Sequence, residues 1–521
     1  MADPFYITTA ISYPNGPPHI GHAYEAIAAD VIARFKRSHG YDVRFQTGTD
    51  EHGLKMAQVA RGEGVEPKAL ADRMSSLFIH MCDRLEVSYD RFIRTSEEAH
   101  HRASQAIWTK MAENGDLYLG RYEGWYSVRD EAYYDESELI TGEGEEKLSP
   151  QGTPVEWTVE ESWFFKLSAY QQKLLDHYAA NPDFIRPETR RNEIVRFVES
   201  GLSDLSISRT SFDWGVKVPG SEGHVMYVWL DALTNYITGL GYPDDTELWR
   251  RYWPADVHLI GKDVVRFHAV YWPAFLMSAS IELPKQVFGH GFLLSRGEKM
   301  SKSIGNVVDP FTLADHFGVD QLRYFLMREV TFGQDGSYSP EAIVNRVNAE
   351  LANSFGNLAQ RVLTQIVRNC DGSLPQIHGH TDADNSLFDL VCGAAGQAIP
   401  NAYADLALSK ACELWIHSVF ACNAYIDEQA PWALKKTDPE RMQTVLATLY
   451  ICIAILAVAI RPVIPASVDK LLDSMGVDPQ LRTFEAIQGH WYSPLAESGF
   501  RLEAPQPLFP RLELPEEEGV K

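Results

Sequence analysis

Residues 5–47 read FYITTAISYPNGPPHIGHAYEAIAADVIARFKRSHGYDVRFQT, and this stretch decides the fold. Residues 5–11 are mostly β-branched and aromatic, which is typical of a strand, and the turn-forming cluster at 13–18 ends that strand. From residue 19 apolar side chains recur at helical spacing until Gly40, and residues 43–47 alternate as a second strand. Strand, helix and strand form a βαβ unit, so we expect an open α/β domain with a parallel sheet and ligands at the carboxyl ends of its strands.

The rest of the chain extends this domain and then changes character. Between about residues 116 and 225 the composition shifts to Gly, Glu and Tyr, which predicts an insertion with an acidic face and a small core of its own. Beyond about residue 350 the strand signals stop and helical periodicity takes over. Strands that would complete the sheet are expected at 225–229, 257–260 and 287–290. The expected segments are 1–115, 116–225, 226–290, 291–350 and 351–521.

Length and charge exclude some classes of protein. A chain of 521 residues is longer than one hydrophobic core usually serves, and its 45% hydrophobic content is enough for several cores. We therefore expect about three structural units. The formal charge of −24 argues against indiscriminate nucleic-acid binding, and any RNA partner must meet a local surface that opposes the overall field.

Cysteine spacing and hydropathy predict a reduced, cytosolic setting. No two cysteines form a C-x-x-C pair, so neither a disulfide scaffold nor a zinc knuckle is indicated. The first thirty residues do not resemble a signal peptide, and we expect a cytoplasmic protein. The apolar run at 449–460 is shorter than the ~20 residues of a membrane span, so it predicts a buried helix and no membrane association. The six cysteines are Cys82, Cys370, Cys392, Cys412, Cys422 and Cys452.

A nucleotide site is indicated where the first strand's loop enters the helix. The motif His19-Ile20-Gly21-His22 places backbone N–H groups and two imidazoles at a helix N-terminus, which favours an anion. Histidines three apart could also share a metal, but no third ligand of recognisable spacing accompanies them. A capping role for His19 is the other alternative.

A second motif, Lys299-Met300-Ser301-Lys302-Ser303, sets two lysines among small polar residues. Lysines in such a loop can neutralise a departing pyrophosphate, chiefly in the transition state. Taken alone, a loop of this composition is usually solvated surface. Its pairing with the histidine motif makes the phosphate role the better hypothesis.

Together the two motifs resemble the signature pair of the class I aminoacyl-tRNA synthetases. Four further stretches resemble the methionine-specific members of that family, and the resemblance covers nearly the whole chain. It implies a Rossmann-like catalytic domain split by a connective insertion, a signature-lysine and stem-contact region at 291–350, and an α-helical anticodon-binding domain at 351–521. The four stretches are AISYPNG at 10–16, TDEHG at 49–53, YVWLDA at 227–232, and GKD at 261–263 continuing to His268.

By this resemblance the enzyme would activate methionine with ATP and Mg²⁺ and charge tRNA(Met), including the initiator. A thioether suits aromatic walls and an ammonium suits a carboxylate, which would be Asp50. ATP would be bound by His19, Gly21, His22, Lys299, Ser301 and Lys302, with the two histidines and two lysines as catalytic residues. The methionine pocket would be lined by Ala10, Ile11, Tyr13, Asp50, Trp229, Leu233, Tyr236, Val264 and His268.

Anticodon reading would fall to Asn357, Arg361 and Trp432, since a tryptophan can stack on a base while Asn and Arg bond base edges. Core packing is the alternative for Trp432, but Pro431 before it favours a helix end with an outward ring. Leu233 departs from the proline found in part of the family. The stretch at 125–133 lacks the family's zinc-binding cysteines, so we expect no zinc and an insertion held by packing alone. No dimerisation module is evident, which favours a monomer.

Three alternatives stay open. The valine, isoleucine and leucine enzymes carry a large editing insertion for which this chain has no room, and the cysteine enzyme needs a pocket cysteine. A small-molecule adenylyltransferase shares the histidine turn but leaves the helical domain unexplained. A non-catalytic relative has no physical reason to keep both histidines and both lysines.

Overall fold

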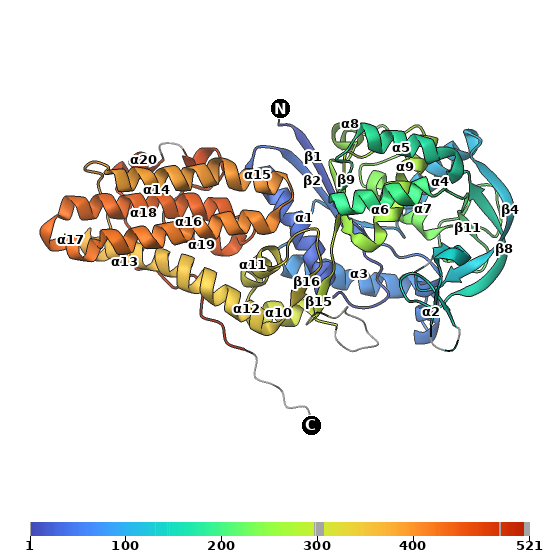
Figure 1. The fold of residues 1–521 in the computed structure, drawn as a ribbon, viewed down its shortest axis with the longest axis horizontal. Helices are drawn as coiled ribbons and strands as arrows, with labels where there is room; N and C mark the ends of the chain where they lie inside the picture. The colour runs from blue at the N-terminus through green and yellow to red at the C-terminus, as the bar shows by residue number, and fades with distance from the viewer. Residues whose placement is uncertain are drawn as a thin grey trace, which may run out of the picture.

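A computed structural model describes residues 2–130, 132–142, 144, 146–295, 297, 307–488 and 491–514. The molecule is elongated, with a helical bundle at one end and a sheet-containing catalytic part at the other (Figure 1). The helix α1 (Ile20–Ser38) lies where the two parts meet.

The catalytic part is built on one parallel sheet of six strands in the order β3-β2-β1-β13-β14-β9. From β1 the chain crosses through α1 to β2 and then β3, whereas β13 and β14 lie on the other side of β1. Ligands of such sheets bind where the strand order reverses, here between β1 and β13. The strands are β1 (Pro4–Thr9), β2 (Asp42–Thr49), β3 (Arg91–Arg94), β9 (Ile185–Arg186), β13 (Val257–Gly261) and β14 (Val287–His290). The predicted α/β fold is confirmed.

The strand expected at 225–229 is wrong in most of its length. Only β12 (Val225–Met226) is extended, and it pairs antiparallel with β11 (Ser208–Arg209) outside the main sheet. From Val228 the chain is the helix α7 (Val228–Thr238), because the Tyr227 carbonyl accepts the N–H groups of Leu230 and Asp231. Periodicity over a short apolar run does not distinguish a strand from a buried helix. The remaining catalytic helices are α2 (Leu54–Glu63), α3 (Pro67–Arg84), α4 (Glu98–Glu113), α8 (Glu247–Tyr252) and α9 (Trp272–Ser278).

The insertion carries an antiparallel sheet in the order β10-β8-β4-β5. The expectation of a separate small core is wrong, since its buried side chains belong to one cluster with α4, α7 and α9. Phe165, for example, packs edge-on against Phe275 of α9, with ring centroids 5.1 Å apart. Packing one face of this sheet against the catalytic helices removes more apolar surface from water than a separate core of a few residues could. The elements are β4 (Leu117–Ser127), β5 (Ala132–Tyr134), β8 (Glu156–Phe165), α5 (Gln171–Ala180), α6 (Glu188–Glu199) and β10 (Leu205–Ser206).

Helices dominate the chain after β14. The helix α18 is long and apolar enough to cross a membrane by length and composition, but 89% of its most apolar window is buried inside the bundle. The buried ion pair of Arg323 with Asp30, 2.6 Å, ties α11 to α1, and Arg323 Nε also donates to the Val463 carbonyl that follows α18. The bundle is thus anchored to the helix that begins at the histidine motif. The helices are α10 (Pro310–Phe317), α11 (Val319–Glu329), α12 (Pro340–Arg346), α13 (Asn357–Asn369), α14 (Asp382–Gly393), α15 (Ile399–Ala404), α16 (Leu408–Gln429), α17 (Pro431–Thr437), α18 (Pro439–Ile460), α19 (Pro465–Ser474) and α20 (Tyr492–Glu497).

Candidate active site

A cavity of about 470 Å³ opens at the carboxyl ends of β1, β2 and β13. All nine residues that the sequence assigned to a methionine pocket line it, and so do His19, Gly21 and His22. The structure therefore gathers residues from four distant motifs around one space. The cavity is also lined by residues that were not predicted from the sequence, which include Glu25, Arg129, Asn235, Asp263, Phe267 and Phe292. Helical spacing could have found Glu25, three residues after His22 on the same helix.

The histidine motif forms the start of α1. His19 Nδ1 accepts the Gly21 N–H at 3.1 Å, and His22 Nδ1 accepts the His19 N–H at 3.1 Å. Because both Nδ1 atoms are acceptors, each neutral ring carries its proton on Nε2. A Cβ at Gly21 would lie 2.9 Å from the His19 ring, so only glycine leaves room for this arrangement. The capping role considered for His19 is present, and it fixes the ring as a potential Nε2–H donor.

An aromatic wall closes one side of the cavity. The rings of Trp229 and Phe267 stack with centroids 3.8 Å apart and planes 5° apart. The Tyr236 hydroxyl donates to His268 Nε2 at 2.5 Å, while His268 Nδ1–H donates to the Val264 carbonyl at 2.9 Å. Burial lowers the pKa of His268 to about 4, so this pair is neutral near pH 7. A neutral, polarizable wall suits an uncharged thioether.

A π-helical turn explains how two successive residues reach the cavity. Phe267–Tyr271 is wound as a π-helix, which is wider than an α-helix and is frequent at functional sites. Both Phe267 and His268 line the cavity from this turn. The sequence carries no periodic signal for such a turn, which is why Phe267 was missed.

Asp50 follows β2 and is only 8% exposed. Its N–H donates to the Ser12 carbonyl at 2.9 Å, and the Ser12 N–H donates to the Gly48 carbonyl at 2.9 Å. These bonds join the loop after β1 to the loop after β2. The two loops that line the cavity are therefore fixed relative to each other.

Glu51 and His52, which follow Asp50, form ion pairs with other side chains and do not line the cavity. The buried Glu51 carboxylate accepts Arg94 Nε at 2.6 Å. His52 Nδ1 lies 2.6 Å from Asp231 Oδ2, and His100 Nε2 lies 2.7 Å from Asp231 Oδ1. Since Asp231 belongs to α7, which also carries Trp229 and Tyr236, this network links the Asp50 loop to the aromatic wall.

The second motif lies outside the described residues, so the structure does not place Lys299, Ser301 or Lys302. The strand that leads to it, β15 (Leu293–Ser295), pairs in parallel with β16 (Gly336–Tyr338). Just before β15, Phe292 N–H donates to Asp335 Oδ1 at 2.8 Å, and Asp335 Oδ2 binds Lys262 Nζ at 2.8 Å. These two bonds to Asp335 hold the backbone at Phe292, on the rim of the cavity, just before the second motif.

The part of the insertion where the resemblance would place a zinc site contains a hydroxyl cluster. Asp130 Oδ2 accepts Thr153 Oγ1 at 2.6 Å, Ser149 Oγ at 2.7 Å and the Tyr134 hydroxyl at 3.1 Å, and Ser127 Oγ lies 2.6 Å from Thr153 Oγ1. One carboxylate among hydroxyls does not fit zinc, which prefers thiolate and imidazole. The expectation that packing alone holds the insertion is wrong for this turn. Its serine and threonine hydroxyls form buried hydrogen bonds that also hold it.

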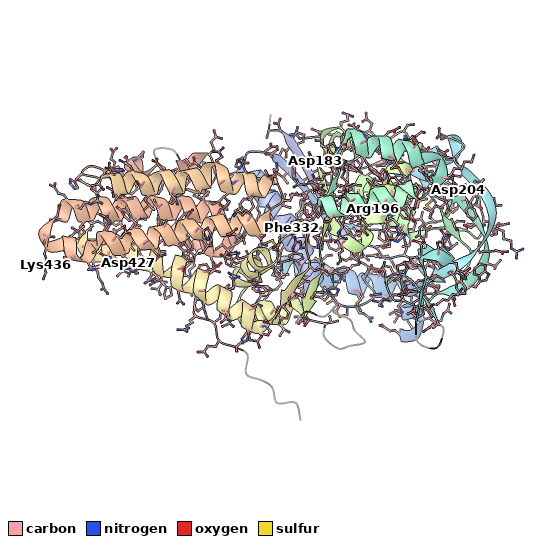
Figure 2. All side chains as sticks on the ribbon, in the orientation of Figure 1. Asp183, Arg196, Asp204, Phe332, Asp427 and Lys436 are labelled. Carbon is pink, nitrogen blue, oxygen red and sulfur yellow. The ribbon has the colours of Figure 1, made fainter. Side chains whose placement is uncertain are left out.

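The candidate anticodon residues lie at the bundle tip. Arg361 Nη2 binds Asp427 Oδ1 at 2.7 Å, and its guanidinium lies 5.5 Å from the centre of the Trp432 ring. Trp432 is 50% exposed at the start of α17, as its position after Pro431 predicted, and Asn357 is exposed one turn before Arg361. Asp427 marks this tip, far from the catalytic end (Figure 2).

Comparisons with known proteins agree with this geometry. Residues 5–363 match the family model described as "tRNA synthetases class I (M)", and residues 398–520 match "Anticodon binding domain of methionyl tRNA ligase". Methionine--tRNA ligase from Brucella suis is 60% identical over 97% of this chain and 98% of that protein, and its counterpart from Rhizobium meliloti is 56% identical over 98% and 99%.

Solved structures extend the likeness to three dimensions. Mycobacterium tuberculosis methionyl-tRNA synthetase in complex with methionyl-adenylate matches with a TM-score of 0.95 and 55% identity, covering 98% of this chain and 100% of that one. The free-state structure from the same organism matches with a TM-score of 0.88 and 51% identity, covering 99% of each chain.

Proposed function

The chain belongs to the methionyl-tRNA synthetase family of class I aminoacyl-tRNA synthetases, and on this premise we propose which of its residues carry each step. It is an aminoacyl-tRNA ligase that activates methionine with ATP and transfers it to the terminal adenosine of tRNA(Met) for protein synthesis. One observation carries the residue assignment: the histidine pair and the aromatic wall line the same cavity.

In the first step the methionine carboxylate attacks the α-phosphorus of ATP in line. A bond forms between a carboxylate oxygen and phosphorus, the bond to the bridging α–β oxygen breaks, and pyrophosphate leaves with the electron pair. No side-chain nucleophile is needed, so positioning and charge stabilisation supply the rate. Asp50 holds the ammonium, and the Nε2–H groups of His19 and His22 donate to the phosphate oxygens.

Charge on the phosphates is met by Lys299, Lys302 and magnesium. Among the described residues no group of three or more His, Cys, Asp or Glu could hold a metal ion. A magnesium ion would therefore be held mainly by phosphate oxygens, as Mg²⁺ usually is in nucleotide sites, and would supply charge neutralisation when ATP is bound. No zinc is proposed, because the Asp130 cluster offers one carboxylate and no thiolate.

In the second step the ribose 2′-hydroxyl of the terminal adenosine attacks the adenylate carbonyl and AMP leaves. Asn357, Arg361 and Trp432 read the anticodon of tRNA(Met), the initiator included. We also propose a cytoplasmic monomer with no membrane association.

Lys302→Ala is expected to lower the rate of methionyl-adenylate formation about a hundredfold, ~3 kcal/mol, because the lysine meets charge that develops on the departing pyrophosphate. Methionine affinity should stay within about twofold. Stopped-flow adenylate formation and equilibrium methionine binding measure the two quantities, with Lys173→Ala on α5 as a control that should change neither. An equal loss of methionine affinity would contradict the role.

Trp432→Ala is expected to raise the KM for tRNA(Met) about tenfold or more, since base stacking on an aromatic ring contributes ~1–3 kcal/mol. Methionine-dependent ATP–pyrophosphate exchange should be unchanged, because the bundle tip is remote from the cavity. Phe420→Ala, an aromatic residue of similar exposure on α16, is the matched control. Damage to both reactions in the Trp432 variant would indicate a folding defect and remove the anticodon role.

The experiment that tests the whole proposal is ATP–pyrophosphate exchange with each of the twenty amino acids. Protein treated with a chelator and then supplied with magnesium should exchange with methionine alone. Exchange with another amino acid would overturn the pocket assignment. Loss of activity that only zinc restores would overturn the zinc-free insertion.

A further inference from the structure

The helical bundle contains a buried ion pair that neither step of the proposed reaction uses. The Asp384 carboxylate on α14 is buried, and its two oxygens accept Arg441 Nη1 at 2.5 Å and Arg441 Nη2 at 2.8 Å. The Tyr425 hydroxyl of α16 donates to the same carboxylate. Because Arg441 belongs to α18, three helices of the bundle are joined at this carboxylate.

The pair is charged at neutral pH and fixes the arginine side chain. Burial alone would raise the pKa of Asp384, but the hydrogen bonds from Arg441 and Tyr425 outweigh this effect and lower it. A guanidinium that contacts both oxygens of a carboxylate is held in one plane and one direction. The remaining hydrogen-bonding direction of Arg441 is therefore fixed as well.

The same guanidinium reaches the corner between α16 and α17, residues 429–432. Arg441 Nη2 donates to Gln429 Oε1 at 2.6 Å, and Gln429 is the last residue of α16. Ala430 follows with φ 43°, in the left-handed region that is unfavourable for a residue with a Cβ. Pro431 and Trp432 then begin α17. Such a conformation persists only where the surrounding contacts hold it, and the bond to Gln429 is one of them.

A second arginine contacts this corner but differs in its accessibility. Arg361 binds Asp427 of α16, and its guanidinium lies 5.5 Å from the centre of the Trp432 ring. The Arg361 side chain is 30% exposed, whereas that of Arg441 is 15% exposed and its guanidinium bonds Asp384 and Gln429. Arg361 can therefore meet RNA directly, while Arg441 acts on the corner through Gln429.

We propose that Arg441 and Gln429 are positioning residues for anticodon reading, which hold the corner at 429–432 so that the Trp432 ring is already placed for stacking on a base. Half of the Trp432 side chain is exposed, so packing does not by itself fix the ring. A ring that is ordered before RNA arrives loses less conformational freedom on binding, and the complex is tighter for it. The inference rests on the proposed role of Trp432 and adds the residues that support it.

Gln429→Leu is the test, because it removes the acceptor of Arg441 Nη2 and leaves the ion pair with Asp384 intact. The variant should raise the KM for tRNA(Met) in aminoacylation about fivefold, the size expected for one lost hydrogen bond, with little change in kcat. Methionine-dependent pyrophosphate exchange should be unchanged. Gln443→Leu is the matched control, since Gln443 also lies on the bundle and its Oε1 accepts the Gln376 N–H at 3.0 Å, outside the corner. The control should change neither reaction.

A double-mutant cycle separates positioning from a general loss of structure. In protein that already carries Trp432→Ala, Gln429→Leu should raise the KM for tRNA(Met) by less than about twofold, because no ring is left to position. The same rise in both backgrounds, or no rise in either, would overturn the proposal. If thermal unfolding showed that Gln429→Leu does not fold, Gln429→Asn, whose amide is too short to reach Arg441, should give the same results. An unchanged KM in Trp432→Ala alone would instead refute the anticodon role on which the proposal rests.

Discussion

Asp50→Asn is expected to lower kcat/KM for methionine in pyrophosphate exchange about a thousandfold, equivalent to about 4 kcal/mol. Asparagine keeps the shape of the side chain and the backbone bond to Ser12, so the loops after β1 and β2 should stay in place. What is lost is the charge opposite the substrate ammonium, in a position only 8% exposed. An ammonium left without its partner in such a site costs far more than one at the surface.

The measurement compares methionine with 4-(methylthio)butanoate, which lacks the amino group. Wild type should bind methionine much more tightly than this analogue, and Asp50→Asn should bind the two with similar affinity. The KM for ATP should change little. If the variant retained the wild-type preference for the amino group, Asp50 would not be the ammonium partner.

His22→Ala is expected to slow adenylate formation several hundredfold, about 3.5 kcal/mol, as for loss of a donor aimed at charge developing in the transition state. The structural reason is the hydrogen bond from the His19 N–H to His22 Nδ1, which leaves the proton on Nε2. Removing His22 also frees the His19 backbone, so both donors of the pair are affected. Methionine affinity should persist, because the aromatic wall is untouched.

A matched control exists at the opposite end of α1. His39 follows the last turn of α1 and packs on Phe35 and Phe484, away from the cavity. His39→Ala should leave exchange unchanged, and thermal unfolding should show that both variants keep the fold. Equal loss in the two variants would mean that α1 stability, rather than phosphate contact, explains the His22 effect.

The residues predicted for the methionine pocket from short motifs line the cavity, whereas Phe267 and Asn235, which also line it, were not predicted. Ala10, Asp50 and Val264 were predicted from the family resemblance, and each lies after a strand of the parallel sheet, where ligands of such sheets bind. Phe267 depends on a π-helical turn that has no sequence period. The turn around Asp130 depends on Ser149 and Thr153, about twenty residues away, whose hydroxyls have no recognisable spacing.

The sequence by itself determined the α/β class, because this depends on local periodicity and on short spacings along the chain, whereas the roles of the two motifs and of the pocket residues were predicted from the family resemblance. Only the tertiary structure decided which imidazole nitrogens carry protons and which hydroxyls surround Asp130. The physical reason is distance along the chain. The Tyr236 to His268 hydrogen bond and the stacking of Arg266 on Phe197 join residues that no local rule connects, and burial then sets their charge and hydrogen bonding.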